Sequence, residues 1–210
     1  MDAKLKICGM KEPANILEVA GLQPDYLGFI FYKQSKRYVE GLTPAFVKDL
    51  PADIKRVGVF VNEELLKVAE LAGLYGLNAV QLHGAESAVY CVELQSILAE
   101  DGIEIIKAFG IDEDFNFAVL ETYENTVDYF LFDTQTPQHG GSGKAFDWKL
   151  LDGYKLDKPY FLSGGIGPDS LDQLQKIDDP RLFAIDVNSK FETAPGLKDV
   201  NKLIDFKKRI

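Results

Sequence analysis

The most constraining feature of this chain is a short apolar run followed by a helical pattern, repeated from one end of its 210 residues to the other. Two of the runs, residues 57–61 and 129–132, are continuously apolar, which is typical of parallel strands covered on both faces. Eight such units predict an α/β protein with a closed (β/α)8 TIM barrel, forming a single domain over residues 1–210. The candidate strands begin near Leu5, Tyr26, Arg56, Asn78, Ile103, Val127, Pro159 and Leu182.

The rival architecture is an open, doubly wound sheet, which usually needs only about five or six strands. Between the strands, Leu65, Val68 and Ala72 recur at the spacing of one helix face. They predict an amphipathic helix after Asn62, whose side chain suits a helix cap. No linker or low-complexity tract marks an interior boundary, so the repeat favours the barrel.

Composition and charge limit the partners of this chain. Hydrophobic residues make up 46% of it, enough for one core. Its 23 Lys and Arg residues against 33 Asp and Glu residues give a net charge of −10, so we expect no nucleic-acid partner. No apolar run approaches the roughly 20 residues that cross a bilayer, and the beginning lacks a signal-peptide segment. We therefore expect a cytoplasmic protein with no membrane partner.

The chain has only two cysteines, too few for a disulfide framework or a thiolate zinc site. Cys91 falls on the apolar stripe of a predicted helix and is assigned a packing role. Cys8 directly follows the first predicted strand. A free cysteine is more often a small buried hydrophobe, but at a strand end its thiol can face an active site.

Chemically active side chains follow several of the strands. Cys8, His83, Lys107, Asp133 and Asp186 stand at five strand ends, and in a barrel chemistry collects at the carboxyl-terminal ends. We therefore expect these side chains to converge. The ordinary alternatives are a cap or an ion pair for Asp133 and a hydrogen-bonded core residue for His83. One His with one Asp, His83 and Asp186, does not make a metal site, so we predict no metal.

Two loops look suited to an anion: the loop after the seventh strand, with Gly164 and Gly165, and the loop after the eighth, with Asn188 and Ser189. Glycines let backbone N–H groups approach a ligand, and a helix N-terminus adds partial positive charge. Barrels commonly hold a phosphate at this pair of loops. Ordinary turn glycines are the alternative for each loop taken alone.

A glycine cluster at residues 140–144 invites interpretation as a nucleotide loop. The Walker pattern would need Gly at Gln138 and Ser or Thr at Ala145, and the dinucleotide fingerprint fails as well. With Gly141 and Gly143, the cluster is instead predicted to belong to a long loop that closes over a ligand. A surface loop without function is the alternative.

Arg37 lies in the loop after the second strand, close to aromatic residues. Its planar guanidinium can bind a carboxylate through two parallel hydrogen bonds. A solvated loop arginine is the alternative.

In this order, these segments resemble the phosphoribosylanthranilate isomerases, a family of single-domain barrels of tryptophan biosynthesis. The resemblance is spread over the whole chain, and the combination is highly specific although no single piece is. It rests on residues 6–10, 28–31 with 35–39, 57–62, 80–84, 132–133, 140–144 with 146–148, 163–166, and 186–189 with 195–199.

The resemblance implies an Amadori rearrangement of N-(5-phosphoribosyl)anthranilate to 1-(2-carboxyphenylamino)-1-deoxyribulose 5-phosphate, without cofactor or metal. It implies that Asp133 is the general acid, Cys8 the general base and Arg37 the ligand of the anthranilate carboxylate. We therefore expect a small phosphosugar as the partner and a monomer or homodimer. The remaining residues implied to bind the substrate are Gln81, His83, Gly141, Gly143, Gly164, Gly165, Asp186, Asn188 and Ser189.

Three alternatives stay open. An indole-glycerol-phosphate synthase would carry a longer N-terminal extension with a Lys and Glu catalytic set. A ribulose-phosphate epimerase would use paired aspartates and a metal, with His ligands that only His83 and His139 could supply. A non-catalytic barrel could bind a phosphorylated ligand and regulate a partner, but retention of both Cys8 and Asp133 argues against it.

Overall fold

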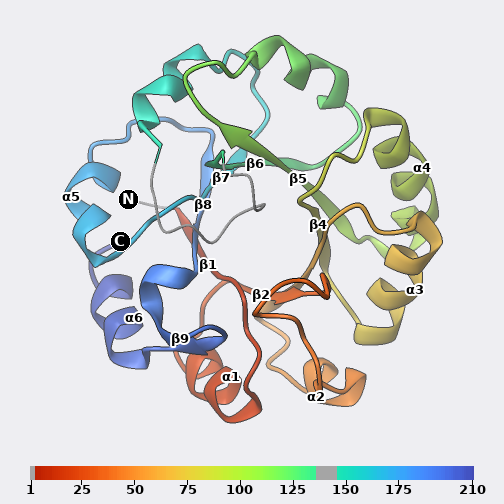
Figure 1. Ribbon diagram of the computed structural model, residues 1–210, viewed down its shortest axis with the longest axis vertical. Coiled ribbons are helices and arrows are strands. Elements are labelled where there is room, and N and C mark those ends of the chain that lie inside the picture. The colour runs from red at the N-terminus through yellow and green to blue at the C-terminus, as the bar shows by residue number, and fades with distance from the viewer. Residues whose placement is uncertain (1–2, 136–145) are drawn as a thin grey trace.

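Eight parallel strands close into a barrel in the order of the chain, as the ring of arrows in Figure 1 shows. The computed structural model describes residues 3–135 and 146–210. Each strand begins within two residues of its predicted start, and β1 pairs with β8 to close the ring. The strands are β1 (Lys4–Ile7), β2 (Tyr26–Ile30), β3 (Lys55–Phe60), β4 (Ala79–Leu82), β5 (Glu104–Ile111), β6 (Tyr129–Thr134), β7 (Tyr160–Leu162) and β8 (Leu182–Val187).

The helical segments surround the barrel (Figure 1). The α-helices are α1 (Pro13–Ala20), α2 (Pro44–Lys48), α3 (Leu65–Tyr75), α4 (Ala88–Leu98), α5 (Leu171–Leu174) and α6 (Val200–Lys207). The 3-10 helices are η1 (Ala99–Asp101), η2 (Phe117–Tyr123), η3 (Trp148–Gly153), η4 (Pro168–Ser170) and η5 (Ser189–Phe191). In the described parts of the β5–β6 and β6–β7 connections the helical segments are 3-10, a distinction that apolar periodicity does not make.

The apolar stripe of α3 is buried as predicted, because Val68 and Ala72 are both fully covered. The predicted cap is wrong: the N-cap position is Glu64, which makes no side-chain cap hydrogen bond. Asn62 instead has a positive φ of 50°, and its Oδ1 accepts from the N–H of Ala85 at 2.7 Å. Asparagine tolerates this left-handed conformation better than most residues, so here it joins the loops after β3 and β4.

Alternation along the strands divides the core into two layers. On β6, Phe130 and Phe132 pack in the outer layer between strands and helices, whereas Leu131 belongs to a cluster inside the barrel. Because side chains two residues apart share a face, Asp133 lies on the interior face above Leu131. The barrel interior therefore contains an apolar layer around Leu131 and becomes polar toward the carboxyl-terminal ends of the strands, hereafter the mouth.

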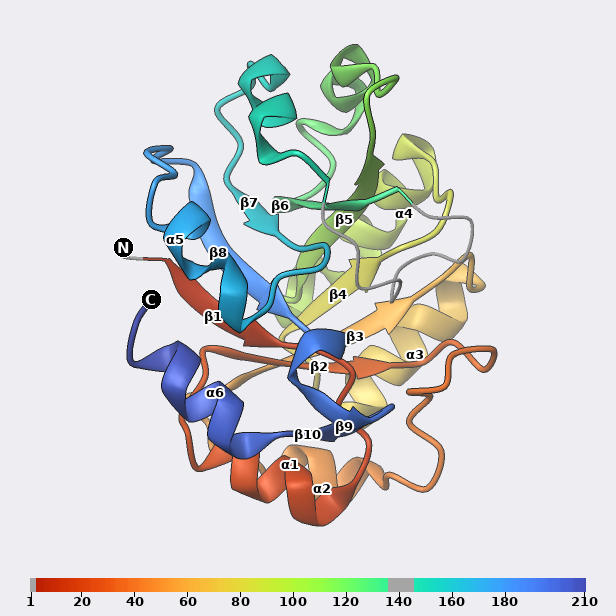
Figure 2. The same ribbon diagram turned by 60° about the vertical axis from the view of Figure 1, so that its left-hand side comes forward.

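An antiparallel hairpin follows β8, made of β9 (Glu192–Ala194) and β10 (Leu197–Lys198). Figure 2 shows it between β8 and α6, close to α1. Two hydrogen bonds attach it to α1: Asn15 Nδ2 donates to the carbonyl of Lys198 at 3.0 Å, and the Lys198 N–H donates to Asn15 Oδ1 at 2.7 Å. The hairpin is thus fixed in place beside the first strands.

Among residues 3–135 and 146–210, no helix combines the length and the apolar character needed to cross a membrane.

Candidate active site

Cys8 directly follows β1, and its backbone N–H donates to the carbonyl of Val187 on β8 at 2.9 Å. Its side chain is 5% exposed. Gly28 on β2 leaves the space for the thiol, because a Cβ added to Gly28 would lie 2.7 Å from Cys8 Sγ. Burial raises the pKa of the Cys8 thiol, while the nearby cations Lys6 and Lys198 act in the opposite direction. Cys8 and Cys91 are both free, and Cys91 is buried on α4 as predicted.

A buried ion pair lies beside the thiol. Lys6 on β1 and Asp186 on β8 occupy paired positions, and Lys6 Nζ is 2.7 Å from Asp186 Oδ2. Burial opposes the charge on Lys6, but Asp186 and Cys8 outweigh it and hold the pKa of Lys6 above its usual value. Burial raises the pKa of Asp186. The other carboxylate oxygen, Asp186 Oδ1, is buried without a hydrogen-bond partner among residues 3–135 and 146–210.

Three residues on β4, directly after β4 and on β6 form a second group at the mouth. His83 Nε2 lies 3.4 Å from Asp133 Oδ2, and Gln81 Nε2 lies 2.7 Å from His83 Nδ1. Asp133 Oδ1 accepts from the N–H of Thr134 at 2.7 Å. Within the described part of the chain, Gln81 Oε1 is buried and has no hydrogen-bond partner. The structure therefore brings Gln81, His83 and Asp133 together, and Asp186 is close enough to Asp133 and His83 for their charges to interact.

The two predicted anion loops end at the same mouth. Gly164 and Gly165 have positive φ values of 88° and 65°, and a Cβ on Gly164 would lie 3.0 Å from Asp133 Oδ1. Glycine is required there both by the backbone conformation and by the close approach. The first loop is followed by η4, which continues directly into the four residues of α5, and the second by η5, which has three residues. Ser189 is half-buried at the start of η5.

Arg37 is not a solvated loop residue. Its side chain is 14% exposed, and it binds Glu192 of the hairpin through two hydrogen bonds, Nε to Oε1 at 2.8 Å and Nη2 to Oε2 at 2.6 Å. Lys198 Nζ also donates to Glu192 Oε1, at 2.7 Å, and to Asn188 Oδ1, at 2.7 Å. The carboxylate predicted for Arg37 was that of the substrate, and the structure places a carboxylate of the protein itself against it. The sequence did not indicate Glu192 or Lys198, because their partners lie far away in the chain.

Lys107 does not join the mouth, contrary to the prediction. It pairs across β5 and β6 with Phe130, an outer-layer residue, so it points outward. There Lys107 Nζ lies 3.1 Å from Glu86 Oε2 and donates to the carbonyl of Gly84 at 2.8 Å. This buried pair shapes the loop after β4, next to His83. Alternation within the strand is the signal that would have corrected the prediction.

Two of the predicted binding residues, Gly141 and Gly143, lie outside the described residues, with the loop predicted to close over a ligand. Among the residues that are described, no group of three or more His, Cys, Asp and Glu side chains is arranged to hold a metal ion.

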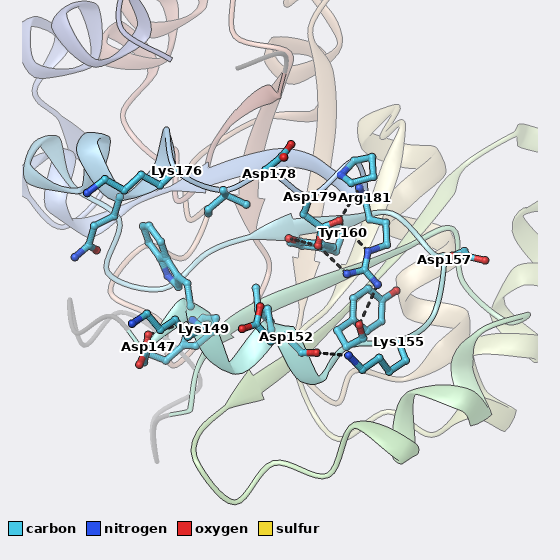
Figure 3. Close-up of a pocket in the computed structure, with 17 residues that line it drawn as sticks. Asp147, Lys149, Asp152, Lys155, Asp157, Tyr160, Lys176, Asp178, Asp179 and Arg181 are labelled. Carbon is cyan, nitrogen blue, oxygen red and sulfur yellow. Dashed lines mark hydrogen bonds and ion pairs between the residues drawn. The ribbon is translucent and has the colours of Figure 1, made fainter.

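A separate groove, lined by residues between Phe146 and Arg181, contains none of the predicted site residues. Figure 3 shows this groove of about 1360 Å³ between η3 and the segment that precedes β8. Tyr160 begins β7 and Arg181 precedes β8, so the groove adjoins the amino-terminal ends of these strands, away from the mouth. Asp179 binds Arg181 there through two hydrogen bonds of 2.8 Å.

This closed barrel carries a thiol, an imidazole and two carboxylates at the carboxyl-terminal ends of its strands. Such a combination of fold and side chains is typical of a TIM-barrel enzyme. The family model for N-(5'phosphoribosyl)anthranilate (PRA) isomerase matches residues 5–209. The chain belongs to this family: it is an isomerase of tryptophan biosynthesis.

Curated relatives agree with this assignment over nearly the whole chain. The N-(5'-phosphoribosyl)anthranilate isomerase of Parabacteroides distasonis is 47% identical over 98% of this chain and 92% of its own length. That of Phocaeicola vulgatus is 42% identical over 93% and 91%.

Solved structures agree as well. The phosphoribosyl anthranilate isomerase of Thermus thermophilus has a TM-score of 0.82 at 27% identity, covering 98% of this chain and 97% of its own. A phosphoribosyl anthranilate isomerase in complex with reduced 1-(o-carboxyphenylamino)-1-deoxyribulose 5-phosphate has a TM-score of 0.74 at 36% identity, covering 99% and 97%. A structure of monomers generated from the dimeric isomerase of Thermotoga maritima has a TM-score of 0.76 at 32% identity, covering 99% and 97%.

Proposed function

We propose that this isomerase rearranges N-(5-phosphoribosyl)anthranilate with Asp133 as the general acid and Cys8 as the general base. The observation that carries the proposal is the buried pair of Lys6 and Asp186, whose charged atoms lie 2.7 Å apart. Lys6 precedes Cys8 by two residues and so shares its face, and Asp186 is close enough to Cys8 and Asp133 for their charges to interact. A thiol and a carboxyl group that flank one buried carboxylate at the mouth can act on the same sugar.

The first step is acid catalysis at Asp133. Its carboxyl group donates a proton to the ring oxygen of the ribofuranose, and the bond between that oxygen and C1 breaks. The lone pair of the anthranilate nitrogen forms the C1=N bond of an iminium ion. His83, 3.4 Å from the carboxylate, and the N–H of Thr134 hold Asp133 in place for this transfer.

The second step is base catalysis at Cys8. Its thiolate removes the proton from C2, and the electrons of the C2–H bond form a C1=C2 bond while the iminium becomes a neutral amine. The resulting enolamine loses its hydroxyl proton and gains a proton at C1, which gives the ketone. Lys6 favours the thiolate form of Cys8. General acid and base catalysis each contribute about 10²- to 10⁴-fold.

The remaining groups hold the substrate at both ends. The backbone N–H groups around Gly164, Gly165 and Ser189 receive the phosphate, and Arg37 receives the anthranilate carboxylate. Asp186 Oδ1 and Gln81 Oε1 are buried acceptors without partners in the described structure, so donor hydroxyl groups of the sugar would satisfy them.

A coupled assay tests this function. Anthranilate and phosphoribosyl pyrophosphate are converted by a purified transferase, and the isomerised product is quantified after addition of this protein. We expect product formation far above the uncatalysed rate, unchanged by a chelator. An unchanged background rate would favour the non-catalytic barrel, and inhibition by the chelator with recovery on added metal would favour the epimerase chemistry.

A further inference from the structure

The hairpin after β8 contains a group that the proposed mechanism does not use, the carboxylate of Glu192. It is 5% exposed and accepts hydrogen bonds from Arg37, from Lys198 and, at 3.1 Å, from the N–H of Gly196. Burial opposes its charge, but Arg37 and Lys198 hold the pKa of Glu192 below its usual value. Glu192 is therefore a fixed anion inside the protein.

The geometry of this contact leaves one edge of Arg37 for another ligand. Glu192 occupies the edge formed by Nε and Nη2. A guanidinium has five N–H groups, so Nη1 and the second hydrogen of Nη2 form a further edge that can bind a carboxylate through two bonds. Within residues 3–135 and 146–210, Arg37 Nη1 makes no hydrogen bond.

The stem of Arg37 fixes where this edge lies. Gly9 has a positive φ of 76°, and a Cβ added to it would lie 2.6 Å from Arg37 Cδ. Arg37 therefore packs against the residue next to Cys8, and the charges of Arg37 and Cys8 are close enough to interact. Exposure of the side chains rises from 0% at Lys198 through 5% at Glu192 to 14% at Arg37, so Arg37 is the member nearest to solvent.

Charge supports the same arrangement. One anion between two cations leaves a net charge of about +1 when Arg37, Glu192 and Lys198 are all ionised. An incoming carboxylate is therefore attracted although Glu192 is nearby. Lys198 is itself fixed through its backbone by Asn15 of α1, so the cluster rests on a rigid support.

We propose that Glu192 is a positioning residue that orients Arg37 toward the carboxylate of the substrate, which makes the hairpin an element of substrate specificity. This inference rests on the proposed function. Glu192 acts only through Arg37, and Lys198 with the N–H of Gly196 keeps Glu192 in place.

The test compares substrates with and without the carboxylate. Kinetics are measured with N-(5-phosphoribosyl)anthranilate and with the corresponding phosphoribosyl aniline, for the unmodified protein, Glu192→Gln and Arg37→Ala. We expect Glu192→Gln to raise KM for the anthranilate substrate about tenfold with little change in kcat, because a charged hydrogen bond is weakened. It should leave kcat/KM for the aniline substrate unchanged and add nothing in the Arg37→Ala background.

Asp179→Asn provides the matched control. Asp179 binds Arg181 with the same two-bond geometry but lies at the groove of Figure 3, away from the mouth. The same chemical change there should leave both KM values unchanged. If Glu192→Gln folds poorly, Glu192→Asp keeps the charge, shortens its reach and should give a smaller rise in KM.

Equal losses with both substrates, or an unchanged KM for the anthranilate substrate, would show that Glu192 is only structural. A calorimetric titration separates this result from failure of the proposed function, since it needs no turnover. The reduced product analogue should bind Glu192→Gln about tenfold more weakly than the unmodified protein, and its carboxylate-free counterpart equally to both. Equal affinity of the two proteins for the reduced analogue would overturn the inference even if neither substrate reacts.

Discussion

At the scale of single residues, the chemistry depends on the neighbours of two side chains. Cys8 lies beside Lys6, and Asp133 lies beside His83. Asp186 connects the two groups, because it binds Lys6 and is close enough to Asp133 for their charges to interact. The two proposed catalytic residues therefore have different immediate neighbours and share Asp186.

Cys8→Ala and Asp133→Asn should each lower kcat by about 10²- to 10⁴-fold, because each removes one proton-transfer group. Asp133→Asn preserves the side-chain volume and Cys8→Ala removes one heavy atom, so the free energy of unfolding should change by about 1 kcal/mol at most. The coupled assay measures the rates and urea denaturation measures the stability. Normal turnover in either variant would refute its assigned role.

The pH dependence of kcat/KM should reflect the buried thiol. Burial raises the pKa of Cys8, so the thiolate fraction and the rate should rise toward alkaline pH. Lys6→Met removes the nearest favourable charge, raises the thiol pKa further and should move this rising limb to higher pH. Lys6→Met combined with Asp186→Asn removes both charges of the pair, so the rising limb should move less than in Lys6→Met alone. A limb that stays in place would mean that Cys8 is not the titrating base.

At the scale of elements, the contact between β1 and β2 sets the position of the thiol. A Cβ at Gly28 would lie 2.7 Å from Cys8 Sγ and 3.1 Å from Cys8 Cα, too close for either to remain in place. Glycine in the middle of a strand is otherwise unfavourable, so the close approach explains its presence.

Gly28→Ala should therefore displace Cys8 and reduce kcat by up to about 10²-fold, the effect expected of a displacement near 1 Å. Gly73→Ala is the matched control, since Gly73 is exposed on α3 with nothing within 4 Å of its added Cβ. It should raise the free energy of unfolding by about 0.4–1 kcal/mol without affecting kcat. Both variants are measured by the coupled assay and urea denaturation, and full activity in Gly28→Ala would contradict the assigned role of this contact.

Sequence patterns located the strands but not all of the contacts that their side chains make. The strands were predictable because each is a short apolar run. The outward direction of Lys107 was missed because the strand end was considered without its alternation. The pairing of Arg37 with Glu192 spans 155 positions, a separation that no local pattern reports.

At the scale of the whole molecule, charge is distributed unevenly. The chain carries −10 overall, yet Lys6, Arg37 and Lys198 are close enough to Cys8 for their charges to interact with it. Scattered surface charges are screened over about 8 Å at physiological salt, so these cations dominate at contact range. An acidic molecule can in this way receive an anionic substrate.

Stability should fall as the solution becomes acidic. Arg181 lowers the pKa of Asp179, so the charged carboxylate stabilises the fold above its unfolded pKa of about 4, and this contribution is lost as pH falls through the lower folded value. The pKa of Glu192 is also lowered, so its contribution to stability is likewise lost in acid. Burial raises the pKa of Asp186, so the contribution of Asp186 to stability instead increases as the pH falls. The urea midpoint of Asp179→Asn should therefore decline less between about pH 5 and 3 than that of the unmodified protein. Equal declines would exclude Asp179 as a contributor.

The repeat of eight strands, the side chains at the strand ends and the glycines of the loops after β7 and β8 could all be predicted from the chain, because they depend on local periodicity and on backbone conformation. Which of those side chains meet depends on tertiary packing. Closure of the barrel joins β1 to β8 and brings Lys6 against Asp186, while the hairpin brings Glu192 against Arg37. These contacts join residues far apart in the chain, and only the packing of the complete barrel sets their distances.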